Sequence, residues 1–587
     1  MKVLFSVLER TLLIYKPMRF QKVYSSGVIV LLMLGICISV VCFLLACVSY
    51  ITIKNYIDAL SADGNVESFT VERFSRIGFQ LKVISGALFL VAMIGFWFRE
   101  RFTTYSYLRV GNALGYMGGL IKRVGFFLTQ EKLSVKIGLL FIVVLGVLVR
   151  WAHLLQPISY DEAFTYIYFV NRPLLIGLSD YLYPNNHVFH TFLSHLSCSI
   201  FGDGLAAIRL PAFIAGCLVV PVTFFLGRKL FDTPTALLAA TGISLCNHLV
   251  EFSVMARGYS LITLFFLIIF FLAMEIRSGK NGVLAWFVLV SALAIYTVPV
   301  FIYALLIVML WLYWSNSFNG TKKITVSLIC IVVLSILLYM PVLLVSGTDQ
   351  LIANDAVKHS SYVQVIENII PFKAELLKGW LRALPLGITI LITIGFFVHL
   401  ITAKKDIRIL AVSIIAVSIM GIFVQRIIPP ARVWQFLLPL IYLLSSAGLV
   451  YLSTFILKKY AGYVIVIVGA IFLFIQTPKV YRLQPVHWGE IAENQELAQF
   501  FKSTLKETDQ VKVDMPTDYP LEYYFRREKL DIGFIRKVKE SSDRIFFVVN
   551  HASNQTLQEV AKNYPLDKLT RVKKMEFTEV YELKKGP

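Results

Sequence analysis

Charged residues are scarce in this sequence. Only 16% of the 587 residues are charged and 57% are hydrophobic, whereas typical soluble domains have roughly 25% charged residues. This composition excludes an ordinary water-soluble enzyme or binding module. It predicts a polytopic membrane protein that buries apolar surface against lipid and against its own helices.

Cysteine is also sparse, and its placement excludes two kinds of small domain. The seven cysteines lie almost entirely within apolar runs, no two of them form a CxxC pair, and none follows Cys330. A disulfide framework and a cysteine zinc site are therefore not expected.

Acids are outnumbered by basic residues, 36 against 56, which gives a formal net charge of +20. The Lys and Arg residues occupy short connections between apolar runs, as the positive-inside rule requires of cytoplasmic loops. This placement argues against a nucleic-acid partner. The first apolar run is too long for a cleaved signal and predicts a retained signal-anchor. The basic residues before it, which put the N-terminus in the cytoplasm, are Lys2, Arg10, Lys16, Arg19 and Lys22.

Long apolar runs recur along most of the chain, and a helix needs about 20 such residues to cross a bilayer. We predict thirteen spans, with residues 284–314 divided into two short helices at Pro299. The spans are residues 26–50, 81–98, 135–155, 207–226, 235–250, 259–275, 284–299, 300–314, 324–345, 384–402, 407–424, 433–455 and 461–477. The predicted domains are a two-span extension with a basic cytoplasmic segment (1–134), a transmembrane core (135–477) and an extracytoplasmic α/β domain (478–587).

The C-terminal tail differs in composition from the rest, with charges throughout and only short apolar stretches. Its periodicity predicts helices over Glu493–Thr504 and Ser553–Asn563 and strands over Val511–Met515 and Arg544–Asn550. At roughly 100 residues the tail is large enough for a modest core. The basic segment 99–134 is expected to form one or two cytoplasmic surface helices.

An acidic pair, Asp161-Glu162, directly follows the third predicted span and faces the outside in this topology. Charges beside a membrane helix are costly unless they serve a function. In a chain so poor in acids, these two carboxylates indicate proton-transfer chemistry on a substrate that arrives from the lipid.

Most other unusual polar residues also fall in external connections. From Asn185 the pattern is helical, and its histidines either form a wetted polar face or direct His187 into a site beside Asp161. Arg209 opens the next span at its outer end, where an arginine can also snorkel to the interface. The other polar residues of these connections include Asn186, His248, Glu251, Arg257, Tyr259 and Arg432.

Several external arginines near a carboxylate pair fit a lipid that bears a phosphate, because arginine binds phosphate bidentately and keeps its charge. A sugar on a polyprenyl phosphate has a leaving group that needs no general acid, so one carboxylate suffices as base for an acceptor hydroxyl. An extracytoplasmic enzyme has no nucleotide sugars at hand, and a lipid-linked donor suits this topology.

Five motifs occur in one order and on one predicted side of the membrane: Ser159-Tyr160-Asp161-Glu162-Ala163, Asn186-His187, Ile208-Arg209-Leu210-Pro211, Met255-Ala256-Arg257-Gly258-Tyr259 and Pro430-Ala431-Arg432. With these motifs the sequence resembles the GT-C superfamily of multispanning glycosyltransferases over about residues 135–455. The similar branch holds protein O-mannosyltransferases and lipid A aminoarabinose transferases. The resemblance implies an α-helical membrane fold with a small C-terminal α/β domain, an inverting transfer, and a bacterial plasma membrane as the location.

The resemblance also implies roles for individual residues. Asp161, as the base, and Glu162 take the place of the family's acidic pair, and Arg209 that of its external arginine. The sequence departs from the family pattern at Val188, where relatives commonly have Pro, and at Met255, where they have an acid directly before Ala-Arg. Because of the second departure, the correspondence of Glu251 to the family's acid stays open. The candidate site therefore comprises catalytic Asp161 and Glu162, donor-binding Arg209, Arg257, Tyr259 and Arg432, and substrate-binding or supporting Asn186, His187, His248 and Glu251.

Three questions stay open at this stage. No spacing is diagnostic of a metal, and a divalent cation near His187, His248 and Glu251 could assist the phosphate, although arginines could neutralise it alone. The acceptor is a protein, lipid or glycan. Two other functions are a transporter or flippase of lipid-linked sugars and an inactive protein that binds them. Transporters tend to have repeats and polar groups near the midplane, and neither is seen in this sequence.

Overall fold

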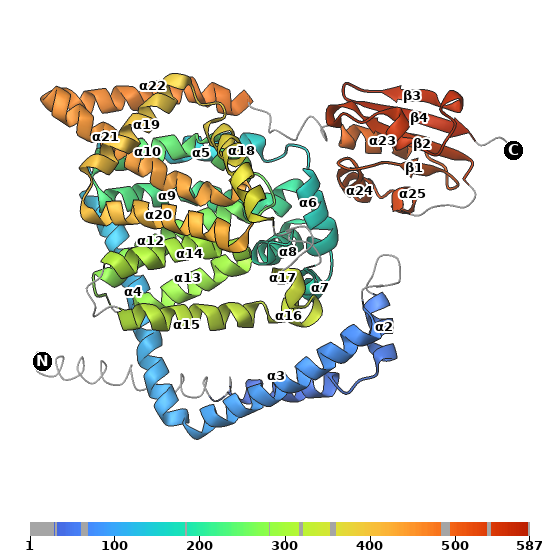
Figure 1. Ribbon diagram of the computed structural model, residues 1–587, viewed down its shortest axis with the longest axis horizontal. Coiled ribbons are helices and arrows are strands. Elements are labelled where there is room, and N and C mark those ends of the chain that lie inside the picture. The colour runs from blue at the N-terminus through green and yellow to red at the C-terminus, as the bar shows by residue number, and fades with distance from the viewer. Residues whose placement is uncertain are drawn as a thin grey trace, which may run out of the picture.

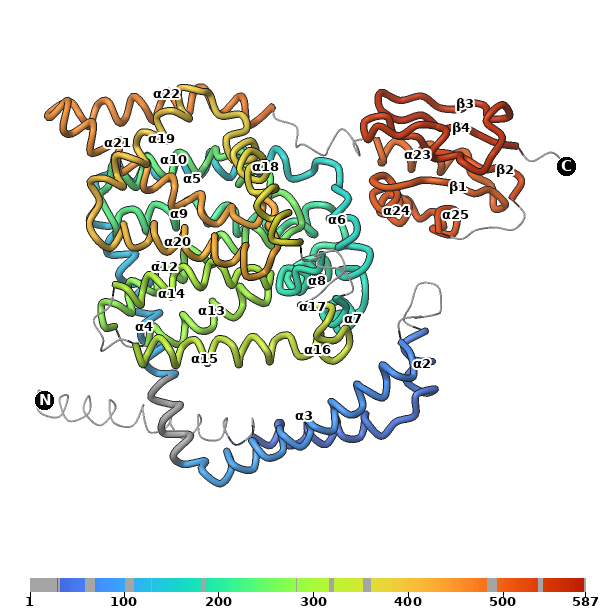
Figure 2. The backbone as a smooth tube through the Cα atoms, viewed as in Figure 1, coloured from blue at the N-terminus to red at the C-terminus, as the bar shows by residue number. Residues whose placement is uncertain are grey.

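The computed structural model describes residues 29, 32–59, 69–181, 185–280, 282–315, 321–352, 360–482, 493–536 and 542–584. The protein is mostly helical, with a large helical bundle, a separate pair of long N-terminal helices below it and a small sheet domain at one end (Figure 1). The tube view shows the same three parts and the path of the chain between them (Figure 2). The basic residues that predict a cytoplasmic N-terminus lie outside the described residues.

The bundle comprises helices from α5 to α22. They are α5 (Leu133–His153), α6 (Tyr160–Thr165), the π-helix η1 (Tyr166–Val170), α7 (Leu174–Ser179), α8 (Val188–Phe201), α9 (Leu205–Leu230), α10 (Thr233–Ser244), α11 (Asn247–Ser253), α12 (Tyr259–Arg277), α13 (Val283–Thr297), η2 (Pro299–Phe301), α14 (Ile302–Ser315), α15 (Thr321–Leu338), α16 (Met340–Val345), α17 (Thr348–Ile352), α18 (Tyr362–Leu381), α19 (Leu386–Thr402), α20 (Lys405–Gln425), η4 (Ala431–Leu437), α21 (Leu438–Leu457), η5 (Lys458–Tyr460) and α22 (Ala461–Arg482).

Helix α12 is the centre of the bundle. In its most apolar stretch 78% of the residues are buried, a larger share than in any other long apolar helix of the described chain. Phe266 and Phe270 are fully buried along it, and Phe266 packs against Phe436 with ring centroids 4.9 Å apart. The first turn of this central helix, at Tyr259, therefore has a fixed position relative to the rest of the bundle.

The protein is an integral membrane protein. Seven helices of the described residues are long and apolar enough to cross a membrane, and up to ten spans result if each bent pair of helices is counted as one. Helices cover all thirteen predicted segments within the described residues. α13 and the η2–α14 stretch are shorter, at 10–17 residues, so the count of thirteen stays a prediction.

Two of the bent helix pairs lie close to one another at the end of the bundle that carries α6. Helices α10 and α11 meet at 59°, and α18 and α19 meet at 111°. At the first break, Arg150 is fully buried and donates from Nη1 to the carbonyls of Ser244 (3.0 Å) and Gly146 (2.9 Å). An interrupted helix leaves carbonyls without partners, and in a membrane protein they must be satisfied by protein groups. Arg150 supplies that partner.

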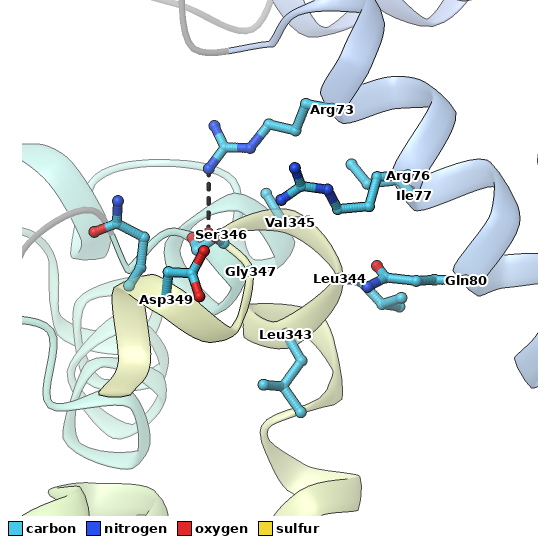
Figure 3. Close-up of a pocket in the computed structure, with 11 residues that line it drawn as sticks. Arg73, Arg76, Ile77, Gln80, Leu343, Leu344, Val345, Ser346, Gly347 and Asp349 are labelled. Atoms are coloured by element: carbon cyan, nitrogen blue, oxygen red, sulfur yellow. Dashed lines mark hydrogen bonds between the residues drawn. The ribbon is translucent and has the colours of Figure 1, made fainter. Parts of the chain in front are cut away.

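The N-terminal helices contact the bundle at both ends. They are the helix Leu32–Leu45, α2 (Tyr50–Ala59), α3 (Val71–Trp97) and α4 (Arg99–Gln130), so the basic segment forms one long helix. Tyr116 and Arg123 of α4 donate to the buried carboxylate of Glu275 on α12, at 3.3 and 3.4 Å. On α3, Arg73 donates from Nη2 to the carbonyl of Ser346 (3.3 Å), beside a cavity of about 180 Å³ between α3 and the α16–α17 turn (Figure 3).

The C-terminal domain is a four-stranded sheet with helices against it. Its elements are α23 (Asn494–Thr504), β1 (Gln510–Lys512), α24 (Asp518–Arg527), α25 (Gly533–Arg536), β2 (Arg544–Asn550), η6 (His551–Ser553), α26 (Leu557–Val560), η7 (Leu566–Lys568), β3 (Thr570–Lys574) and β4 (Thr578–Lys584). The strand order is β1-β2-β4-β3, with β1 and β2 parallel and the other pairs antiparallel. Ile545 and Phe547 face one apolar cluster while Phe546 and Val548 face another, as alternation along a strand requires.

The α/β prediction for the tail is confirmed, but two of its elements differ. The predicted helix Ser553–Asn563 is only one helical turn, Leu557–Val560, and the predicted strand Val511–Met515 is shortened to Gln510–Lys512. The helix Leu557–Val560 begins only after its capping residue, Thr556. The strand Gln510–Lys512 ends before the turn that leads to α24. The sequence periodicity also missed α24, whose apolar positions are mainly tyrosines.

Candidate active site

The acidic pair lies on α6, a helix too short to be stable alone. Ser159 caps it in a capping box, in which the Ser159 side chain accepts from the Glu162 amide and the Ser159 amide donates to Glu162 Oε2. The two acids therefore point in different directions. Glu162 turns back toward the protein and is 1% exposed, whereas Asp161 is half-buried.

Glu162 forms a buried ion pair with Arg209. The guanidinium binds both carboxylate oxygens, with Nε–Oε1 at 2.8 Å and Nη2–Oε2 at 2.9 Å, and the amide of Ala256 also donates to Oε1 at 2.6 Å. Burial alone would raise the pKa of Glu162, but the charge and hydrogen bonds of Arg209, with the amides of Ser159 and Ala256, outweigh it and lower the pKa. Glu162 is thus an ionised structural group.

Arg209 has no donor left for a phosphate. Its remaining N–H groups bind the carbonyls of Leu154 (2.8 Å), Gln156 (2.7 Å) and Pro157 (3.0 Å), and its side chain is fully buried. These contacts favour a structural role for Glu162 and Arg209, while their predicted roles in catalysis and donor binding stay predictions. Snorkelling is excluded, because the guanidinium is inside the protein.

Asp161 is the acid that remains available. Within the described residues its carboxylate accepts no hydrogen bond. Its negative charge interacts electrostatically with the guanidinium of Arg432. Its backbone carbonyl accepts from Asn185 Nδ2 at 3.2 Å. The carbonyl of Asn185 in turn accepts from Arg257 Nη1 at 2.8 Å. Asn185 thus joins the acidic segment to the arginine at the start of α12.

Arg257 is buried but incompletely satisfied. Its Nη1 also donates to Thr165 Oγ1 at 3.0 Å, whereas its Nε has no partner among the described residues. Its side chain is 3% exposed. A buried guanidinium with an unused N–H is well suited to bind a further acceptor.

His187 presents a second donor at the same place. The amide of Gly258 donates to His187 Nδ1 at 2.7 Å, so the neutral imidazole carries its proton on Nε2. Nε2 lies 3.2 Å from Arg257 Nη2, which is also a donor, and two donors cannot satisfy each other. Burial and the nearby charge of Arg257 lower the pKa of His187 well below its usual range, so the ring is neutral at pH 7.

These groups lie around the ring of Tyr259. Arg257 and Arg432 lie over it, with guanidinium carbons 5.8 and 5.9 Å from the ring centroid, and the ring of His187 meets it edge-on at 4.8 Å. Tyr259 is also the first residue of the 19-residue helix α12. A helix N-terminus, arginine guanidinium groups and imidazole N–H groups are the kinds of donor with which proteins bind anions.

The histidines of this region do not form a wetted polar face. His187 is 3% exposed and His190 is fully buried, so that alternative is wrong. Asn186 is a supporting residue, because its amide binds the carbonyls of Gly177 (2.8 Å) and Asp180 (2.7 Å) and its Oδ1 accepts from Thr191 (2.8 Å). These hydrogen bonds hold the turn that precedes His187 and so set the position of its side chain.

His248 and Glu251 lie on α11, on another side of the site. Glu251 forms an ion pair with Arg382 at 3.7 Å. His248 is buried beside Phe252, which contacts Tyr259 in turn. In the residues the structure describes, no group of three or more His, Cys, Asp or Glu side chains converges as metal ligands would. The described residues therefore provide no set of metal ligands at the position predicted for a divalent cation.

Sequence reasoning missed Asn185, Thr165 and Gly258, which connect the two halves of the site. Asn185 and Gly258 adjoin motif residues, and their roles are backbone contacts that no residue type reveals. Thr165 lies in the same sequence segment as the acidic pair, but its residue type does not indicate its contact with Arg257.

The comparisons with known proteins agree with this fold. Residues 186–344 match the family described as dolichyl-phosphate-mannose-protein mannosyltransferase. No curated protein sequence matches the chain. The crystal structure of ArnT from Cupriavidus metallidurans in the apo state is similar, with a TM-score of 0.52 and 12% identity over 76% of this chain and 97% of that one.

ArnT from the same organism bound to undecaprenyl phosphate is similar to the same extent, with a TM-score of 0.51, 12% identity and the same coverage. The oligosaccharyltransferase of Archaeoglobus fulgidus in the apo form has a TM-score of 0.43 and 12% identity over 64% of this chain and 59% of that one, too low for any inference. The fold match to ArnT extends over 76% of this chain, while the family match covers only the segment from Asn186 to Leu344. The chain therefore shares its fold with ArnT, and its residues 186–344 match the family described as dolichyl-phosphate-mannose-protein mannosyltransferase, in line with the resemblance seen in the sequence.

Proposed function

We propose that this protein transfers a sugar from a polyprenyl-phosphate-linked donor to an acceptor hydroxyl, with inversion, at the extracytoplasmic face of a bacterial plasma membrane. The observation that supports it best is an available carboxylate, Asp161, joined through Asn185 to the anion-binding groups around Tyr259. A base and an anion site side by side are what transfer from a phosphate-linked sugar requires.

In this reaction Asp161 takes the proton of the acceptor hydroxyl as the acceptor oxygen attacks the anomeric carbon. The bond between that carbon and the phosphate oxygen breaks, and its electron pair leaves with the polyprenyl phosphate. The lipid phosphate thereby changes from a diester with one negative charge to a monoester with two. A general acid is not needed, because phosphate is a stable leaving group.

The groups around Tyr259 fit the charge that develops on the phosphate. Arg257 offers its unused Nε–H, His187 its Nε2–H, and Arg432 its guanidinium, which lies over the ring of Tyr259. These donors are fixed before the substrate binds, so they need no reorganisation as the bond breaks. Arg257 and His187 are buried, which strengthens their electrostatic effect.

Glu162 and Arg209 have a structural role in this proposal. Their buried pair fixes the segment on which Asp161 lies, and Glu162 binds the amide of Ala256 next to Arg257. One ion pair thus sets the distance between the base and the phosphate-binding arginine.

Three points support a polyprenyl-phosphate-linked sugar as the donor. The site lies at the end of the bundle where α6 and the C-terminal domain meet, and this end is extracytoplasmic in the predicted topology, where nucleotide sugars are not at hand. The similar protein ArnT has been crystallised with undecaprenyl phosphate. The matching family is described as using dolichyl-phosphate-mannose. A protein, lipid or glycan hydroxyl can each serve as acceptor.

The test is release of polyprenyl phosphate from a short-chain polyprenyl-phosphate hexose by the purified full-length protein, in the presence of peptide, lipid or glycan acceptors. Asp161→Asn keeps the size of the side chain and removes the base. Turnover should fall by about 10²–10⁴, the usual contribution of a general base, while donor affinity changes little. Movement of the intact donor across a vesicle membrane without bond cleavage would favour a flippase instead. Near-normal turnover in Asp161→Asn would remove Asp161 from the mechanism.

A further inference from the structure

The C-terminal domain contacts the acidic segment directly. Helix α24 of that domain lies beside α6 (Figure 1), and one apolar cluster runs from Ala163 and Tyr166 through Leu521 and Tyr523 to Phe546 of the sheet. The domain is therefore packed onto the bundle at the helix that carries Asp161.

One side chain of α24, Tyr519, makes most of this contact near Asp161. Its ring centroid lies 5.2 Å from Tyr160, 5.1 Å from Phe164 and 5.7 Å from Tyr168, in each case edge to face. These three residues stand one before, three after and seven after Asp161. On a helix such positions form one face, next to the position of Asp161 itself.

We infer that Tyr519 is a positioning residue for Asp161, so that the C-terminal domain is part of the catalytic site rather than a separate binding module. This inference rests on the proposed function, because Asp161 is taken as the base. The six residues of α6 cannot hold their conformation alone, and Glu162 secures only the inner side of the helix. Tyr519 secures the adjoining side, and edge-to-face ring pairs add directional preference to that contact.

The orientation of the Tyr519 ring is itself fixed. The guanidinium of Arg536 lies over the ring, 4.5 Å from its centroid, and Arg536 Nε donates to Glu522 at 2.7 Å. Glu522 is 2% exposed, and it also binds Arg526. A chain of contacts therefore leads from the core of the C-terminal domain to the segment of Asp161.

The experiment is a double-mutant cycle in the full-length protein, measured as release of polyprenyl phosphate. Tyr519→Ala should lower turnover by about tenfold to a hundredfold, the effect of a small misplacement, with unchanged donor affinity. In the Asp161→Asn background the same change should have almost no further effect, because there is no base left to position. Tyr519→Phe keeps the ring and should restore turnover. Tyr564→Ala is the matched control, since Tyr564 packs on Phe547 at the other face of the sheet.

A purely structural role predicts a different pattern. If Tyr519→Ala lowers turnover by the same factor with and without Asp161, or if Tyr519→Phe is as impaired as Tyr519→Ala, the inference is wrong. Arg536→Gln removes the guanidinium from the Tyr519 ring while Glu522 keeps its pair with Arg526, so it gives a second route and should lower turnover in the same direction. The inference is also wrong if neither Arg536→Gln nor Tyr519→Ala changes turnover.

Hydrogen exchange separates this inference from the proposed function. Amides of residues 160–170 should exchange faster in Tyr519→Ala than in the wild type or in Tyr564→Ala. Unchanged exchange would overturn the positioning role, whereas faster exchange in a protein that transfers no sugar would overturn only the proposed function.

Discussion

At the scale of single residues, two adjacent acids have very different environments. Glu162 is enclosed by Arg209 and two backbone amides, and Asp161 has a half-exposed carboxylate without such partners among the described residues. An acid whose hydrogen-bonding capacity is fully used inside the protein cannot take a proton from a substrate. The proposed function therefore assigns stability to Glu162 and proton transfer to Asp161.

This division predicts that Glu162→Gln is more harmful to stability than Asp161→Asn. Removing one partner of a buried ion pair leaves Arg209 unpaired and costs about 3–5 kcal/mol. Since the folded-state pKa of Glu162 is lowered, its stabilisation is present above the ordinary carboxyl pKa of about 4 and is lost as pH falls below it. Thermal unfolding in detergent from pH 7 down to below pH 4, compared with Glu162→Gln, measures both effects. Equal stability of Glu162→Gln and the wild type at pH 7 would contradict the structural role.

A second residue-scale prediction concerns Arg257 and Arg432. Arg257→Lys keeps the charge but loses the fork that reaches Thr165, Asn185 and a phosphate, so turnover and donor affinity should both fall. Arg432→Lys should be milder, because Arg432 is exposed. Binding of a non-hydrolysable polyprenyl phosphate and turnover are the two measurements. Normal affinity and rate in both Arg257→Ala and Arg432→Ala would place the phosphate elsewhere.

At the scale of elements, close helix approach determines the packing on the α18–α22 side of the bundle. Helices α19 and α21 meet at Gly395 and Gly448, where a methyl group on Gly448 would clash with the carbonyl oxygen of Gly395. Small residues at such crossings allow membrane helices to approach closely.

We therefore expect Gly448→Ala to destabilise the bundle by about 1–3 kcal/mol, the usual effect of overpacking. The control is Gly462→Ala on α22, where an added methyl group meets no atom within 4 Å. Thermal unfolding of the two variants in the same detergent measures the difference. Equal midpoints for Gly448→Ala and Gly462→Ala would contradict the tight crossing.

At the scale of the whole molecule, the proposed function requires that α6, the anion-binding groups and the C-terminal domain all lie on one side of the membrane. The contacts between α24 and α6 already place the domain beside the acidic segment. Which side this is follows only from the placement of Lys and Arg.

Cysteine labelling in a variant without native cysteines tests this topology. An impermeant reagent added from outside should label Lys568→Cys of the C-terminal domain but neither Lys323→Cys nor Lys405→Cys, all three at exposed positions. Labelling of Lys323→Cys and Lys568→Cys from the same side would overturn both the span count and the extracytoplasmic site.

The sequence alone determined the class of protein, because hydropathy and the placement of basic residues report membrane helices directly. It also pointed to Asp161, Arg257 and His187, since charged or polar groups at membrane helix ends are rare enough to be informative. It could not divide the roles of Asp161 and Glu162, nor find the pair between Glu162 and Arg209, because partners 47 residues apart meet only in the folded chain. For the same reason the clustering around Tyr259 and the contact of Tyr519 with the segment of Asp161 were decided only by the tertiary structure.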